Sequence, residues 1–343
     1  MPYRYSQVAT DALADAQKCI TDRRADPVRN RNTMFRLMQQ NMLAYTYDDH
    51  VPGFARSGVI NSRSFSELLQ QPTVNARAEG TARFGVDFLL TTQQVAKVEG
   101  DIFEQLDGAV LWNTAAMWNT YMVTGDWPGG LRYPRPAATL RRLERQIAVL
   151  ALPRHFDWVR LLTPDAHRAV ERVRAGLRRM DLLLPTSTPD IMVVALPEEF
   201  RQGPGALRYQ TMLPDLRAPA QAILMTAYEE MCGRIEAGEF VLAIAVKKSL
   251  RSDRLYQPLY EANVMQLLLE GRLGAPQVDF EVHTIESAGT GAADTYRAAS
   301  LSAVATNHPN PHRAVRDLYQ LTDAPSLVRR LLDFLTIRMA QIP

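Results

Sequence analysis

Short apolar runs and helix-period patterns alternate along the middle and the end of the chain. Four runs have the length and composition of buried strands: 147–152, 191–196, 240–246 and 278–285. Apolar residues at helical spacing occupy the segments between and after these runs: 165–179, 218–235, 313–321 and 326–342. Strands that alternate with helices predict an α/β fold, with a central mixed sheet flanked by helices.

The first third of the chain is mostly helical in pattern. Apolar residues recur at helical spacing over 10–23 and again after Pro27, a residue that is common in the first turn of a helix. The longest helical pattern covers 95–123, and Glu104 lies beside its apolar stripe. The segment 53–79 is rich in Ser, Asn and Gln, and we expect it to be irregular.

The length of the chain bounds its domain organisation. A chain of 343 residues with 46% hydrophobic residues can bury a large core. We expect a single domain over 1–343, in which a helical region of about 1–125 packs on a core of about 95–343. Gly100 and Gly108 weaken the continuity of the longest predicted helix, because glycine is a poor helix former.

Charge and cysteine content narrow the class of protein. The net charge is only +2, so nucleic-acid binding would require a polarised surface, basic where phosphates lie and acidic elsewhere. Cys19 and Cys232 are too few for a disulfide framework, and neither has a His or Cys at zinc-ligand spacing. The sequence shows no signal pattern and no apolar run that could span a bilayer, which predicts a cytoplasmic protein without a membrane partner.

A cation and two acids flank the predicted strands. Lys247 ends one apolar run, Asp190 begins another after Pro189, and Glu261 follows Lys247 by fourteen residues on a predicted helix. Carboxylates that hold a divalent cation, together with a lysine, can activate water and neutralise charge on a phosphodiester. Each residue also has a simpler interpretation, because Asp190 could cap a turn and Lys247 could be a surface lysine. Nuclease sites often carry an acid two residues before the lysine, but that position is Ala245.

Three charged residues just before the predicted helix suit base recognition. Arginine can donate two hydrogen bonds to guanine O6 and N7, and aspartate can accept one from cytosine N4. Arg251, Asp253 and Arg254 supply these groups within four positions and therefore favour a target rich in G·C pairs. The alternative is a solvated helix end with Asp253 as its cap. The same choice applies to Arg31 near the start of the helix after Pro27.

The string Lys-x-Ser-Leu-Arg-Ser-Asp-Arg, followed by Glu261, resembles the restriction endonucleases that recognise a CCGG core. Their motif is Pro-Asp, then Lys, then Glu fourteen residues later, a permuted form of the PD-(D/E)XK site that leaves position 245 without an acid. Resemblance extends over essentially the whole chain, in segments at 27–31, 39–46, 100–104, 184–190, 249–276 and 280–284. It implies a restriction-endonuclease-like (PD-(D/E)XK) core.

The resemblance implies a catalytic role for four residues. Asp190 and Glu104 would bind the catalytic Mg²⁺, for which Mn²⁺ could substitute. Lys247 would orient or help deprotonate the attacking water, and Glu261 occupies the relocated acid position of the family. The implied reaction is Mg²⁺-dependent hydrolysis of double-stranded DNA.

The resemblance also implies how the DNA is recognised. Arg251, Asp253 and Arg254 would read the CCGG core, and Arg31 and Lys97 would read outer and flanking pairs of a longer palindrome, of which CRCCGGYG is one candidate. A palindromic site implies a two-fold homodimer, and tetramers or larger assemblies on DNA are expected in such a family. Two alternatives remain: a DNA-binding protein of this fold that does not cut, and a metal phosphodiesterase that acts on nucleotides or RNA.

Overall fold

A computed structural model describes most of the chain: residues 27–47, 64–88, 90–127, 133–186, 188–213, 216, 218–250, 255–286, 290–305 and 311–340. The helix predicted at 10–23 lies outside the described residues, as do the expected base-reading residues Arg251, Asp253 and Arg254. Within the described residues, no helix is both long and apolar enough to cross a membrane.

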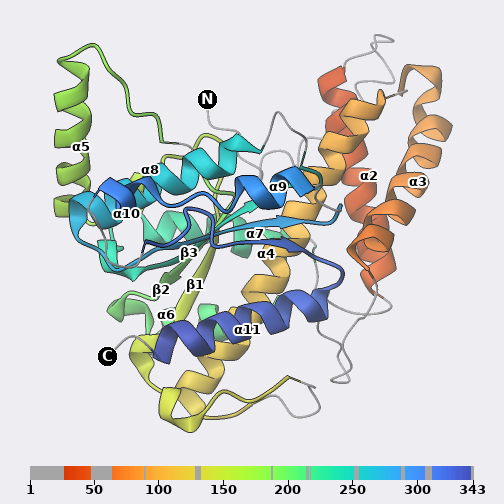
Figure 1. Ribbon diagram of the computed structural model, residues 1–343. Helices are drawn as coiled ribbons and strands as arrows, with labels where there is room; N and C mark the ends of the chain where they lie inside the picture. The colour runs from red at the N-terminus through yellow and green to blue at the C-terminus, as the bar shows by residue number, and fades with distance from the viewer. Residues whose placement is uncertain are drawn as a thin grey trace.

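A five-stranded mixed sheet forms the centre of the molecule (Figure 1). Its strands lie in chain order: β1 (Ile147–Ala151), β2 (Ile191–Ala195), β3 (Phe240–Val246), β4 (Asp279–Thr284) and β5 (Asp317–Gln320). The pairs β1–β2 and β2–β3 are antiparallel, whereas β3–β4 and β4–β5 are parallel. Every residue of β1, β3 and β4 is buried, which accounts for the continuous apolar runs in β1 and β3. The predicted α/β fold and all four predicted strands are confirmed.

The fifth strand corrects the sequence prediction. A helix was expected at 313–321, but β5 occupies 317–320 and pairs in parallel with β4 from Asp317 to Gln320. The strand has only four residues, and none of them is fully buried. Such a short segment carries no clear two-residue period, so the hydrogen bonds offered by the edge of β4 decide its conformation rather than its local pattern.

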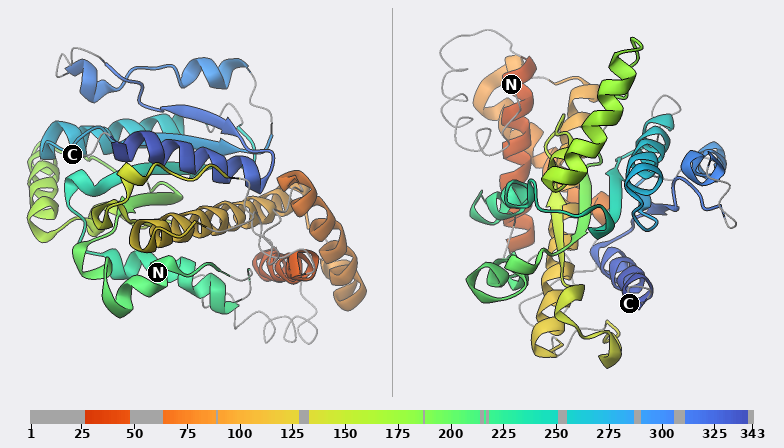
Figure 2. Two further views of the ribbon diagram at one scale, coloured as in Figure 1. Left: turned by 90° about the horizontal axis from the view of Figure 1, so that it is seen from below. Right: turned by 90° about the vertical axis from the view of Figure 1, so that its left-hand side faces the viewer.

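Helices cover the sheet on its two faces. Their bounds are α2 (Pro27–Tyr47), α3 (Phe65–Phe84), α4 (Thr92–Thr124), α5 (Pro164–Arg178), α6 (Gly203–Gln210), α7 (Ala218–Met231), α8 (Tyr256–Leu273), α9 (Thr290–Thr295), α10 (Leu301–Ala305) and α11 (Ala324–Ala340). Figure 2 shows α6 and α7 on one side of the sheet and α8 on the other. Helices α4 and α7 both pack on β1, while α2 and α3 pack against each other and against α4.

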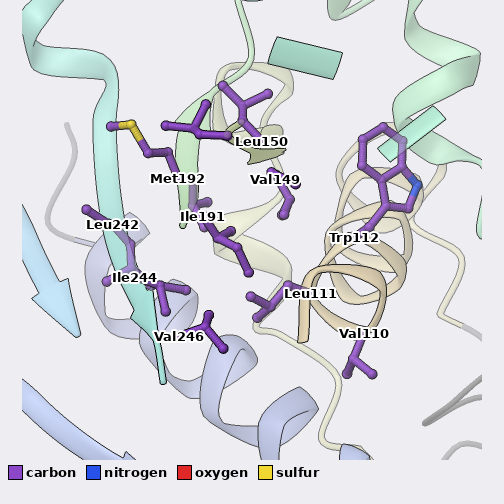
Figure 3. Packing of buried hydrophobic residues seen from close by; sticks show 14 of the residues in the cluster. Val110, Leu111, Trp112, Val149, Leu150, Ile191, Met192, Leu242, Ile244 and Val246 are labelled. Atoms are coloured by element: carbon purple, nitrogen blue, oxygen red, sulfur yellow. The ribbon is translucent and has the colours of Figure 1, made fainter. Parts of the chain in front are cut away.

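Helix α4 is continuous through both glycines that weakened its prediction. A Cβ atom added at Gly108 would lie 3.3 Å from Leu224 Cδ2 of α7 and 3.7 Å from Ile191 Cδ1 of β2. Gly108 therefore lets α4 approach the first residue of β2 closely. Figure 3 shows the apolar layer formed there, in which Leu111 of α4 joins Ile191 and Val246 of the sheet.

Helix α3 is a second correction, because most of it falls in a segment that was expected to be irregular. Ser64 and Glu67 form a capping box, in which each side chain bonds the backbone N–H of the other residue. Phe65, Leu68 and Ala76 of this helix are buried. The helical spacing of these few apolar positions is hidden in the sequence by the polar residues of the exposed face.

The sheet register brings three strand ends to one edge. Ile191 at the start of β2 pairs with Ile244 near the end of β3, and Val246 at the end of β3 pairs with His283 near the end of β4. The backbone N–H of Lys247 donates to the carbonyl of His283 at 2.8 Å. Residues that precede β2 or follow β3 therefore meet at this edge.

Candidate active site

Asp190 and Lys247 meet where β2 begins and β3 ends. Lys247 Nζ donates to Asp190 Oδ2 at 2.7 Å, and the backbone N–H of Val246 donates to the same oxygen at 2.7 Å. The two side chains are mostly buried, with 16% of Lys247 and 20% of Asp190 exposed. The expected proximity of Asp190 and Lys247 is thus found. Because both bonds use Oδ2, Oδ1 is the oxygen that Asp190 could offer to a cation.

The surroundings of Lys247 keep it protonated. Burial acts to lower the pKa of Lys247, but the charge and hydrogen bond of Asp190, followed by the charges of Glu261 and Glu104, raise it above its ordinary value. A lysine in this state can donate hydrogen bonds and supply positive charge, but it cannot accept a proton. This geometry therefore favours an orienting and charge-neutralising role over that of a general base.

Glu104 comes from the first half of α4 and faces the same site. Burial of the Glu104 carboxylate away from water raises its pKa well above the ordinary value, and the negative charges of Asp190 and Asp101 raise it further. The positive charges of Lys247 and Arg154 oppose this shift. Glu104 and Asp190 are therefore neighbouring acids, and ionising both in one place would require a compensating positive charge.

Glu261 lies on the lysine side of the site. It is 2% exposed on α8, and its Oε1 accepts a hydrogen bond of 2.8 Å from Gln257 Nε2. Its negative charge raises the pKa of Lys247 and also that of Tyr296. Glu261 is therefore close enough to influence the lysine, whereas the acids that act on Glu104 are Asp190 and Asp101.

The carboxylates of the site fit a small, hard cation. No group of three or more His, Cys, Asp or Glu side chains is placed to hold a metal ion in the described part of the chain. Mg²⁺ is commonly bound through one or two carboxylates, and waters and substrate phosphates complete its octahedral shell. Asp190 and Glu104 supply two carboxylates that repel each other, so this donor set fits Mg²⁺ in the presence of a phosphate.

A group of cations lies beside the acids. Lys97 lies near Arg154 and Arg31. Burial lowers the pKa of Lys97, and the positive charges of these two arginines lower it further. Asp101 forms an ion pair with Arg154, and the positive charges of Lys97 and Arg31 also act to lower the pKa of Asp101. The chain therefore has the local polarisation that its net charge could not reveal: a basic group next to an acidic site. Such a surface suits a phosphate backbone.

Several residues of this edge were missed by the sequence interpretation. Arg154 and Asp101 had no assigned role, although Asp101 lies inside the segment 100–104 that carries part of the resemblance. Lys248 Nζ donates to Glu99 Oε2 at 2.5 Å, and Glu99 Oε1 accepts from Thr73 of α3 at 3.0 Å. These contacts join the end of β3 to α4 and α3. They connect residues far apart in sequence, so no local spacing could have identified them.

The fold and the family follow from comparison with known proteins. The chain resembles a solved structure described as the type IIF restriction endonuclease Bse634I with cognate DNA, with a TM-score of 0.66 and 16% identity, covering 91% of this chain and 92% of that chain. A second Bse634I structure gives the same TM-score and identity, covering 86% of this chain and 91% of that chain. The protein therefore has a restriction endonuclease fold.

Residues 49–337 match the model of the Cfr10I/Bse634I restriction endonuclease family, and the chain belongs to this family. Membership identifies it as a site-specific nuclease that acts on DNA. No curated protein sequence matches the chain significantly.

Proposed function

We propose that this protein is a Mg²⁺-dependent type II restriction endonuclease that cleaves double-stranded DNA at a palindrome with a CCGG core. Family membership supports the reaction class. The CCGG core rests on the string from Lys247 to Arg254 with Glu261, and the segments at 27–31, 39–46 and 249–276 are similar to the CCGG-core enzyme SgrAI. This similarity makes CRCCGGYG the candidate for the complete site.

One observation carries the catalytic part of the proposal: Asp190, Lys247 and Glu104, from three separate elements, converge at one edge of the sheet. A bound Mg²⁺ would polarise the scissile phosphate and lower the pKa of a coordinated water. Asp190 Oδ1 and the Glu104 carboxylate would hold this ion. The Lys247 ammonium, fixed by Asp190 Oδ2, would orient the attacking water and neutralise charge that develops on the phosphate oxygens. Glu261 would help to keep Lys247 charged.

Recognition is assigned to two groups of residues. Arg251, Asp253 and Arg254 would contact the edges of the G·C pairs of the core. Arg31 and Lys97 would contact the outer pairs, and their position beside Asp101 and Arg154 is compatible with DNA that runs across the active site. A palindrome presents the same half-site twice, so the enzyme would bind as a two-fold homodimer, and tetramers or larger assemblies could engage more than one site.

The test separates cutting from binding. Asp190→Asn removes the charge that holds the cation, and Lys247→Ala removes the ammonium, while the assigned base contacts remain. We expect both variants to lose about 100- to 1,000-fold in single-turnover cleavage, the scale of a lost preorganised electrostatic contact, yet to bind a CRCCGGYG duplex as the wild type does in a gel-shift assay. A wild type that binds this duplex but never cuts it with Mg²⁺ or Mn²⁺ would identify a non-cleaving DNA-binding protein.

A further inference from the structure

A set of buried charges lies directly behind the catalytic edge of the sheet. His283 Nδ1 is 2.8 Å from Asp107 Oδ2, and His283 Nε2 is 3.6 Å from Glu281 Oε2. Arg330 of α11 forms an ion pair with Glu281. The side chains of Asp107, His283 and Glu281 are at most 1% exposed. The two acids, Asp107 and Glu281, balance the two bases, His283 and Arg330, in charge. Asp107, Glu281 and His283 are all shielded from solvent.

The ring of His283 is cationic at neutral pH. Burial would by itself lower the pKa of His283, but the charge and hydrogen bond of Asp107, and then the nearby carboxylate of Glu281, raise it to about 9. The contact between Asp107 and His283 is therefore a charged, directional bond. Buried ion pairs rarely stabilise a fold more than apolar residues of the same size would, so stability alone does not account for this one.

The position of the pair indicates what it could do. Asp107 follows Glu104 by three residues on α4, so the two side chains lie on one face of the helix, ~4.5 Å apart along its axis. The backbone carbonyl oxygen of His283 accepts a hydrogen bond from the backbone N–H of Lys247. The bond between Asp107 and His283 therefore joins α4, which carries Glu104, to β4, which holds the backbone of Lys247 in place.

The same path continues to Asp190, whose Oδ2 is bonded to Val246 N and Lys247 Nζ. Towards the start of α4, Glu99 and Asp101 form further charged contacts with Lys248 and Arg154, whereas beyond Asp107 the helix packs on the sheet through apolar residues such as Leu111 (Figure 3). Apolar packing is non-directional and permits small rotations or shifts of a helix. A charged hydrogen bond is directional and restrains both the rotation and the position of the helix. Asp107 and His283, on the C-terminal side of Glu104, would therefore help to set the distance between the two proposed metal-binding carboxylates.

We propose that Asp107 and His283 are positioning residues, whose bond holds Glu104 at the distance from Asp190 that a shared divalent cation requires. This inference rests on the proposed function, because it assigns a cation to these two carboxylates. Neither Asp107 nor His283 would touch the cation or the DNA. Residues that orient metal ligands from outside the coordination shell typically contribute 10–100-fold to metal affinity or activity.

The main variant is Asp107→Ala, which removes the bond completely. Asp107→Asn is the conservative counterpart, because its amide has the same shape and can still bond to the imidazole ring. Glu281→Ala is the matched control: it disrupts the same buried network but leaves the contact between Asp107 and His283. Asp107→Leu combined with His283→Leu replaces the pair by apolar residues, a change that is often neutral for stability, and it serves if Asp107→Ala does not fold.

Two measurements are made on each purified full-length variant. The first is binding of Mn²⁺ to the protein alone, followed by the electron paramagnetic resonance signal of free Mn²⁺. The second is the Mg²⁺ concentration that gives half-maximal single-turnover cleavage of a CRCCGGYG duplex. Thermal unfolding reports the stability of each variant separately.

We expect Asp107→Ala, or the double Leu variant, to weaken Mn²⁺ binding at least tenfold and to raise the half-saturating Mg²⁺ concentration by a similar factor. Asp107→Asn should recover most of this loss, and Glu281→Ala should stay within about twofold of the wild type even if it melts at a lower temperature. Wild-type metal affinity in both Asp107→Ala and the double Leu variant would overturn the inference, as would an equal loss in Glu281→Ala. A wild type that neither binds Mn²⁺ nor cuts DNA would instead refute the proposed function.

Discussion

The charge on His283 makes the stability of the protein depend on pH in a defined direction. Its pKa is about 9 in the folded protein, compared with an ordinary value of 6.5. A raised folded-state pKa contributes stability that is fully present below pH 6.5 and is lost as the pH rises through 9. The groups that face His283 are Asp107 from α4, Glu281 from β4 and the ring of Tyr319 from β5.

The magnitude follows from the shift. Each pKa unit corresponds to about 1.4 kcal/mol, so a shift of this size is worth roughly 3 kcal/mol in the free energy of unfolding. His283→Gln removes the titrating group. The wild type should therefore lose about 3 kcal/mol more than the variant does between pH 6 and pH 9.5.

Urea unfolding at both pH values, for the wild type and His283→Gln, measures this difference. Other groups titrate over the same range, and subtracting the variant removes their contribution. An NMR titration of the imidazole signal provides an independent value of the pKa. A stability difference that does not change with pH, or an imidazole that titrates near 6.5, would show that the ring is buried without its charge.

Two further predictions concern the packing of α4 and the recognition of outer base pairs. Gly108→Val places branched atoms against Leu224 and Ile191, where even a Cβ would lie 3.3 Å from a Leu224 methyl carbon. The substitution should therefore lower the free energy of unfolding by about 1–3 kcal/mol. An unchanged thermal midpoint would contradict the close approach of α4 to β2. Lys97→Ala should cost roughly 1–3 kcal/mol on duplexes with the preferred outer pairs and should leave the requirement for CCGG intact. Competition binding between duplexes that differ only outside the core measures this effect, and equal losses on all of them would exclude a reading role for Lys97.

The predictable part of the fold came from segments in which local pattern and tertiary environment agree. The runs 147–152 and 240–246 are apolar throughout because both faces of β1 and β3 are covered, and this produces a signal that needs no partner to be recognised. Pro27 correctly marked the start of α2. By contrast, β5 is a short edge strand stabilised by the hydrogen bonds of β4, and the buried face of α3 is hidden among polar residues.

The candidate site shows the same division. Asp190 and Lys247 could be chosen from the sequence because each lies at the end of an apolar run, and their contact at 2.7 Å agrees with that choice. Arg154, Asp101 and the bond between Asp107 and His283 gave no such signal. Their partners lie tens of residues or more away along the chain, and their types are common on any surface.

The amino-acid sequence alone determined strands β1 to β4, the family resemblance and the residues able to supply acid, cation and base-reading groups, because these depend on local pattern and residue chemistry. Only the tertiary structure decided which of those groups share one small volume. It placed Glu104 beside Asp190, kept Lys247 charged and set a buried ion pair behind them. The reason is physical: electrostatic interactions and desolvation depend on distances in space, and the register of the sheet and the packing of α4 set those distances.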